Sequence, residues 1–133
     1  MPKKVINPPH LPAPRGFSHG ILASGGQLLF LAGQDASNGQ GRIVRPGDLV
    51  AQFEQVLQNL QAVVQAAGGQ MQDIVKLNIY VKSRNEYVLK LEGLGVIYRR
   101  FFGDHYPAMA LFEVSGFFQE DNLIEMEGIA YLE

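Results

Sequence analysis

The chain has 133 residues, a formal net charge of −2 and 47% hydrophobic residues. This length and apolar content predict a single domain over residues 1–133, with a core that needs no disulfide or metal to stabilise it. Cysteine is absent, which excludes a disulfide framework, a thiolate metal site and a cysteine nucleophile. The charge balance gives no positive field that would attract nucleic acid, so we expect no nucleic-acid partner.

The N-terminal region, residues 1–16, is rich in proline and predicts an extended arm with little regular structure. No continuous apolar stretch follows the first lysines, as a signal peptide would require. The most apolar run, residues 21–33, is too short to span a bilayer and carries Gly25, Gly26 and Gln27 in its middle. We therefore expect a soluble, cytoplasmic protein with no membrane partner.

The first half of the chain predicts a β-hairpin followed by a helix. Two apolar runs, residues 18–24 and 28–34, flank Gly25-Gly26-Gln27, which is a hairpin signal. Residues 35–47 are rich in small polar residues and predict a loop. Asp48 is the expected N-cap of an amphipathic helix of about 20 residues, which the glycines at 68 and 69 would end.

The second half predicts a strand, a helix and two more strands. Residues 74–81 alternate in hydrophobicity, residues 87–102 carry apolar side chains at helical spacing, and residues 108–114 and 123–132 again favour strands. The predicted order is ββαβαββ. It indicates an α+β fold, a mixed sheet with both helices on one face.

Few residues form a pattern typical of a catalytic or metal site. The histidines, His10, His19 and His105, lie far apart and lack the spacing of metal ligands, so we expect no metal. Glu125 and Glu127 lie two residues apart in an alternating strand, so both carboxylates point to the same face. Two interpretations stay open: a solvated face or a cross-strand pairing with lysine, or a carboxylate at a cleft that acts as general base or holds water.

Short segments along nearly the whole chain resemble one known family. They are Phe17-Ser18, Leu31-Ala32-Gly33-Gln34, Gln55 with Gln58-Asn59-Leu60 and Ala67-Gly68, Asp73-Ile74-Val75-Lys76-Leu77, Tyr98 to Phe102 with Pro107-Ala108, and Glu125-x-Glu127-x-Ile129-Ala130. In this order and spacing the chain resembles the YjgF/YER057c/UK114 family, also called the RidA (reactive-intermediate deaminase) family or endoribonuclease L-PSP.

The resemblance implies a chorismate-mutase-like fold and a homotrimer built around a barrel, with small-molecule clefts between neighbouring subunits. It also implies deamination without a cofactor. In such members an arginine pairs with the carboxylate of a 2-imino or 2-enamino acid, and a glutamate on the last strand positions water. Water attacks the imine carbon, ammonia leaves, and a 2-oxo acid results.

The chain departs from the family pattern in the cleft that the resemblance implies. Met109 stands where the family has the substrate-anchoring arginine, Gly95 where an asparagine is common, and Phe17 where a tyrosine is usual. A thioether cannot pair with a carboxylate as a guanidinium does. Glu125 corresponds to the water-positioning glutamate and Gly33 to the strand-end glycine. We expect Phe17, Gly33, Gly95, Met109 and Leu111 to contact the substrate and Glu125 to be catalytic.

Three functions remain open from the sequence. The first is an enzyme that hydrolyses or tautomerises an enamine or imine metabolite other than ordinary 2-imino acids, using Glu125. The second is a non-catalytic, metabolite-binding or regulatory member of the family. The third is an endoribonuclease, which the net charge disfavours. We also expect no arginine from elsewhere to replace the missing one. Arg99 and Arg100 are expected on a solvated face, and Arg15 is the stronger candidate to enter the cleft.

Overall fold

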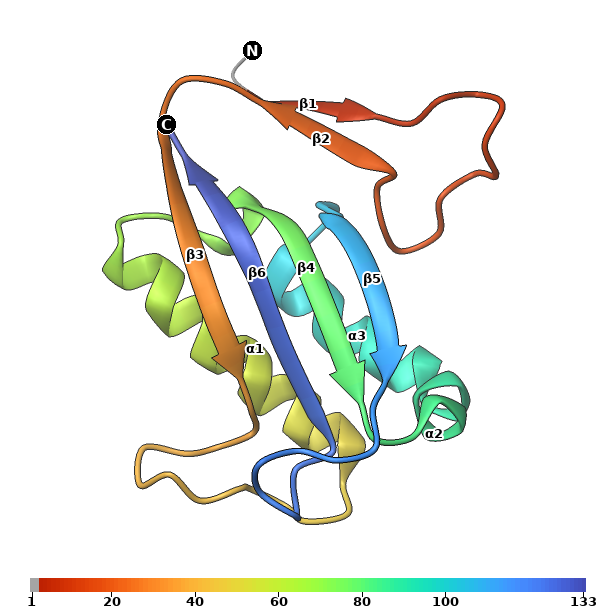
Figure 1. The fold of residues 1–133 in the computed structure, drawn as a ribbon, viewed down its shortest axis with the longest axis vertical. Coiled ribbons are helices and arrows are strands. Elements are labelled where there is room, and N and C mark those ends of the chain that lie inside the picture. Colours follow the sequence, from red (N-terminus) through yellow and green to blue (C-terminus); the bar gives the residue numbers. More distant parts are fainter. Residues whose placement is uncertain (1–2) are drawn as a thin grey trace.

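A four-stranded mixed sheet forms the centre of the computed structural model, which describes residues 3–133. In the spatial order of the sheet, its strands are β3 (Gln27–Gln34), β6 (Ile124–Leu132), β4 (Ile74–Val81) and β5 (Ala108–Glu113). Strand β6 is antiparallel to both β3 and β4, whereas β4 and β5 are parallel. Helices α1 (Leu49–Ala66) and α3 (Leu91–Phe102) lie against one face (Figure 1), so the expected α+β class is confirmed.

Helix α1 begins and ends where the sequence predicts. The Asp48 carboxylate accepts a hydrogen bond from the Ala51 amide at 3.0 Å, which satisfies one of the free N–H groups of the first turn. Gly68, at φ 88°, follows the last turn in a conformation that favours glycine. Within residues 3–133 no helix is long and apolar enough to cross a membrane.

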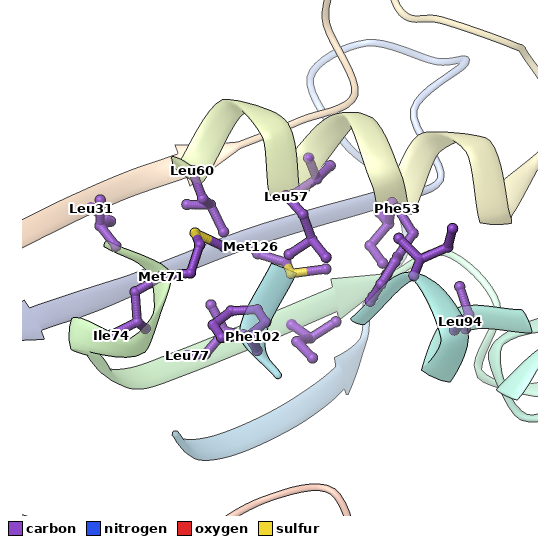
Figure 2. Packing of buried hydrophobic residues seen from close by; sticks show 14 of the residues in the cluster. Leu31, Phe53, Leu57, Leu60, Met71, Ile74, Leu77, Leu94, Phe102 and Met126 are labelled. Carbon is purple, nitrogen blue, oxygen red and sulfur yellow. The ribbon is translucent and has the colours of Figure 1, made fainter. Parts of the chain in front are cut away.

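The core lies between α1, α3 and the covered face of the sheet. Phe53, Leu57 and Leu60 project from α1 toward Leu77 and Met126 of the sheet (Figure 2), and all five side chains are buried. Burying one such side chain stabilises the fold by about 1.5–3 kcal/mol. This packing fixes the even-numbered residues at the start of β6 toward the helices and turns the odd-numbered ones to the opposite face.

The expected hairpin between residues 18–24 and 28–34 is wrong. Strand β2 (Gly20–Ala23) pairs with β1 (Lys3–Ile6) in a separate two-stranded sheet, and β3 pairs with β6. The expectation that residues 1–16 lack regular structure is therefore also wrong for residues 3–6, while residues 1–2 lie outside the described part. Hydrophobic alternation identifies a strand without identifying its partner, and β1 supplies the partner that β3 was expected to be.

The expected second helix, residues 87–102, is two helices. Helix α2 (Arg84–Leu89) begins earlier because the Ser83 hydroxyl caps it, accepting from the Glu86 amide at 3.1 Å. The chain leaves helical geometry at Lys90, with φ −98° and ψ 10°, and α3 starts at Leu91. The break turns α3 onto the sheet while α2 stays at its rim (Figure 1).

The second face of the sheet carries no helix. The pairs Tyr80↔Glu125 and Asn78↔Glu127 place both glutamates on this open face. Phe30 shares it and is 71% exposed. Large exposed aromatic side chains on a sheet face are typical of a surface that another molecule covers.

Candidate functional site

A cavity of about 700 Å³ lies between the helices and the β5 side of the sheet. Four of the predicted substrate-binding residues line it: Phe17, Gly95, Met109 and Leu111. A cavity of this size suits a ligand larger than a few heavy atoms. The structure therefore brings these four residues to one cavity, and their contact with a substrate stays a prediction.

Met109 lies on the helix side of the sheet. Strand β5 is parallel to β4 in the register Leu77↔Met109 and Ile79↔Leu111. Paired residues point to the same face, and Leu77 and Ile79 are buried under the helices. Met109 and Leu111 therefore form an apolar wall of the cavity.

Tyrosines form the wall opposite. The Tyr98 ring stacks on Tyr106 with ring centroids 5.3 Å apart, and its hydroxyl donates to the His105 carbonyl oxygen at 2.7 Å. Burial raises the pKa of Tyr98 far above the usual range, so its hydroxyl stays a hydrogen-bond donor at any ordinary pH. Burial also raises the pKa of Tyr87, a third tyrosine of the lining. This wall is aromatic and largely apolar.

Glu125 and Gly33 meet on the open face. A Cβ built on Gly33 would overlap the Glu125 carboxylate, so only glycine leaves room for this carboxylate over the end of β3. Burial raises the pKa of Glu125, and the negative charges of Asp35 and Glu127 raise it further. None of the ion pairs within residues 3–133 involves Glu125. Its carboxyl can therefore exchange a proton closer to neutral pH than an ordinary glutamate can.

Glu127 is tied into the sheet. Its Oε2 accepts hydrogen bonds from the Tyr80 hydroxyl at 2.7 Å and from Asn78 Nδ2 at 3.3 Å. The Tyr80 ring in turn stacks on Phe112 with centroids 5.5 Å apart. Of the interpretations left open, a cross-strand pairing of Glu127 with lysine is wrong, because its partners are a phenol and an amide. Of the two glutamates, Glu125 is the one without such partners.

The predicted site residues thus fall into two groups on opposite faces. Phe17, Gly95, Met109 and Leu111 line the helix-side cavity, and Gly33 and Glu125 lie on the open face. The sheet separates the groups, so a single chain does not bring Met109 and Glu125 together.

Two polar residues of α1 bind the backbone of the segments next to Glu125: Gln52, which was not anticipated from the sequence, and Asn59, which was noted only as part of the family resemblance. Gln52 is fully buried; its Nε2 donates to the Arg45 and Asp121 carbonyl oxygens at 3.2 and 3.0 Å, and its Oε1 accepts from the Leu123 amide at 2.8 Å. This glutamine fixes the start of β6, two residues before Glu125. The signal was present, because a glutamine at position 52 interrupts the apolar stripe of the helix.

Asn59 holds the loop that follows β3, which contains Asp35. Its Nδ2 donates to the carbonyl oxygens of Asp35 and Ser37 at 3.1 and 2.9 Å, while its Oδ1 accepts from Gln55 at 2.9 Å. These bonds fix the loop that places the Asp35 charge near Glu125.

The cavity lining is positively charged. Arg15, Arg84 and Arg99 contribute to it, and no aspartate or glutamate among the described residues does. The expectation that arginines stay out of this cleft is therefore wrong, whereas Arg99 is exposed to solvent, as expected. Arg100 does point elsewhere, because its Nη1 lies 3.7 Å from the Glu54 carboxylate. Among the described residues, no three His, Asp or Glu side chains gather in a way that could hold a metal ion.

Comparisons with known proteins agree with this arrangement of strands and helices. Residues 9–132 match the Endoribonuclease L-PSP family. A RutC family protein of Pyrococcus horikoshii is 39% identical over 98% of this chain and 99% of its own. A protein of the mite Dermatophagoides farinae named 2-iminobutanoate/2-iminopropanoate deaminase is 28% identical over 99% of this chain and 98% of its own.

A solved structure is also similar over the full length. The YyfB protein of Yersinia pestis, described as a conserved Rid family protein of unknown function, superposes with a TM-score of 0.88. It is 34% identical and the match covers 99% of this chain and 100% of that one. The chain belongs to the Endoribonuclease L-PSP family, the YjgF/YER057c/UK114 or Rid family that its sequence resembles.

Proposed function

We propose that this protein is a cofactor-independent hydrolase of imines or enamines, and that Glu125 holds and deprotonates the attacking water. The observation that carries the proposal is the Glu125 carboxylate itself, which lies over Gly33 with a raised pKa and no ion pair among residues 3–133. A general base is most effective when its pKa lies near the working pH. The likeness to the mite deaminase supports the same chemistry.

The reaction needs only water and the carboxylate. Glu125 takes a proton from water as the oxygen attacks the imine carbon and the electron pair of the C=N bond moves to nitrogen. The resulting amine takes a proton and leaves as ammonia, and a carbonyl group remains. An imine and water thus give a ketone and ammonia, with no change of oxidation state.

We propose further that the working form is a homotrimer in which the open face of one copy meets the cavity of the next. The chain places the two groups of site residues on opposite faces, so a neighbouring copy has to supply Glu125 to the cavity that Met109 lines. The exposed Phe30 and Phe112, 71% and 47% exposed, would be covered in such an assembly. A mass near 14.7 kDa in light scattering at micromolar concentration would contradict the trimer.

The experiment is a deamination assay with imines released by an amino acid oxidase. We expect 2-oxo acid to form faster with the protein than without it, and Glu125→Gln to remove the acceleration. Glu120→Gln, on an exposed loop, is the matched control and should keep it. Equal rates for wild type and Glu125→Gln would refute the role of Glu125.

A second function is favoured by Met109. A thioether in place of an arginine removes one charge-assisted contact, which suits a protein that binds a metabolite without converting it. Ligand binding with no acceleration of any imine in the panel would favour this non-catalytic function. No observation in the structure favours ribonuclease activity.

A further inference from the structure

We propose that Arg99, lying across Gly95, is the anion anchor of the helix-side cavity, and that the cavity takes an organic anion with a bulky aryl or branched alkyl body. The choice of a 2-oxo acid as probe rests on the proposed imine hydrolysis. The anchor itself rests on the cavity alone.

The first argument is the position of the Arg99 guanidinium. Residues 95 and 99 are one helical turn apart, and helical side chains lean back over the preceding turn. A Cβ built on Gly95 would lie only 3.2 Å from Arg99 Nη1. The absence of a side chain at position 95 thus lets the guanidinium lie close against α3, and both residues line the cavity.

The second argument is the set of partners around the three arginines of the lining. Arg84 Nη1 donates to Asn85 at 3.2 Å. For Arg99 and Arg15, residues 3–133 offer no carboxylate within ion-pair distance. Arg100, the next residue along α3, has Glu54 at 3.7 Å. Arg99 and Arg15 are therefore both free to bind a ligand, whereas Arg100 is paired; of the two, Arg99 is the one that lies against Gly95.

The third argument is the contrast between the charge and the rest of the lining. The cavity has three arginines, no acidic residue, and otherwise mostly aliphatic and aromatic side chains. A guanidinium binds a carboxylate through two parallel hydrogen bonds. The apolar walls of Met109, Leu111 and Leu94 would contact an apolar body. At about 700 Å³ the cavity has more room than a two- or three-carbon side chain fills.

The placement of Arg99 also says where the rest of the ligand would lie. Met109 and Leu111 give the β5 wall an apolar surface, whereas the charge lies on the α3 wall. An anion held by Arg99 would therefore leave the space beside β5 for the apolar part of the ligand.

The test is calorimetric binding to the full chain, with phenylpyruvate as the probe and its methyl ester and 2-oxobutyrate as comparisons. We expect the dissociation constant of phenylpyruvate to be lower than that of the ester by a factor of about ten or more. Arg99→Gln should weaken the binding of phenylpyruvate by about 10- to 100-fold. 2-Oxobutyrate should bind more weakly because it fills less of the cavity. Arg100→Gln, one residue away, is the matched control and should bind phenylpyruvate as the wild type does.

Gly95→Ala separates binding from folding. Alanine favours a helix over glycine, so the melting temperature should rise. The new Cβ pushes the guanidinium away by a few tenths of an ångström, so phenylpyruvate should bind several-fold more weakly. A purely structural role for Gly95 would not raise stability and lower affinity together.

Three results would overturn the proposal: equal binding of acid and ester, unchanged binding in Arg99→Gln, or loss of binding in Arg15→Gln alone. Each is independent of the proposed hydrolysis, because catalysis by Glu125 is measured by ammonia release. A protein that loses activity in Glu125→Gln but binds phenylpyruvate normally in Arg99→Gln keeps the proposed function and loses the anchor.

Discussion

Gln52→Leu should destabilise the protein more than any other conservative change on α1. The buried side chain makes three hydrogen bonds, to Arg45, Asp121 and Leu123, with donor–acceptor distances from 2.8 to 3.2 Å. Leucine has a similar size but leaves these backbone groups without a partner. The change therefore tests whether one helix residue holds the two loops beside Glu125.

The magnitude follows from the bonds. At about 1 kcal/mol each, three hydrogen bonds give a loss of about 3 kcal/mol in the free energy of unfolding. The entropy of unfolding, about 2.1 cal/mol/K per residue, is about 0.28 kcal/mol/K for this chain of 133 residues. The melting temperature should then fall by about 10 °C.

The assay is thermal unfolding followed by circular dichroism at one protein concentration, because an oligomer's melting temperature depends on concentration. Gln58→Leu is the matched control, since it makes the same change on the exposed side of α1 and should move the midpoint little. A drop of under about 3 °C for Gln52→Leu relative to that control would refute the reasoning.

Three further predictions concern the surroundings of Glu125. Folding raises the pKa of this carboxyl above its ordinary 4.5, so the folded state holds the proton more tightly and the free energy of unfolding falls as pH rises. In denaturant titrations, Glu125→Gln should have a higher free energy of unfolding than wild type at pH 7.5 and an equal one at pH 3.5. Asp35→Asn removes a charge that raises this pKa, so the acid limb of the deamination profile should move to lower pH; an unmoved limb contradicts the assignment of the base. Gly33→Ala should displace the carboxylate and lower kcat/KM about tenfold or more with little change in melting temperature, which a combined rate and melting measurement checks.

Local signals predicted the helices and strands well where a single segment carries its own information. Asp48 caps the start of α1 and Gly68 ends it with a positive φ. Both features depend on residues within one helical turn of each other in the chain. The choice of partner for β2 depends on residues 3–6. Their two lysines, and the prolines on either side of them, obscured a short strand. Pairing between distant segments is the kind of information that local periodicity lacks.

The positions of the site residues also depend on pairing between distant segments. Alternation within β6 correctly put Glu125 and Glu127 on one face, since the period of a strand is two. The face of Met109 relative to Glu125 depends on the register of β5 against β4 and of β4 against β6, which the sequence pattern leaves open. The motif resemblance therefore named four residues that line the cavity, without showing that Gly33 and Glu125 lie on the other side of the sheet.

Arg99 shows why the charged lining was missed. It follows Leu91 by eight residues and Gly95 by four, so it belongs to the helix face that lines the cavity. Arginine is usually assigned to solvent because it is so often exposed. The glycine one turn earlier was the available signal, because it leaves a space against the helix that a long side chain can fill.

The final prediction concerns Met109, at the position where the resemblance places an arginine. Met109→Arg should raise the hydrolysis of 2-iminobutyrate by less than the roughly 10- to 150-fold that a well-placed anchor contributes. Position 109 points to the helix side beside Leu77, so the new guanidinium enters an apolar wall and competes with Arg99 for one carboxylate. When Met109→Arg is combined with Arg99→Gln, binding of 2-oxobutyrate should be restored but binding of phenylpyruvate should not. The reason is that an arginine at 109 fills the space beside β5 that the phenyl group of phenylpyruvate would occupy. A large gain from Met109→Arg alone, lost again with Glu125→Gln, would show that an arginine at position 109 anchors the substrate and that Arg99 is not the anchor.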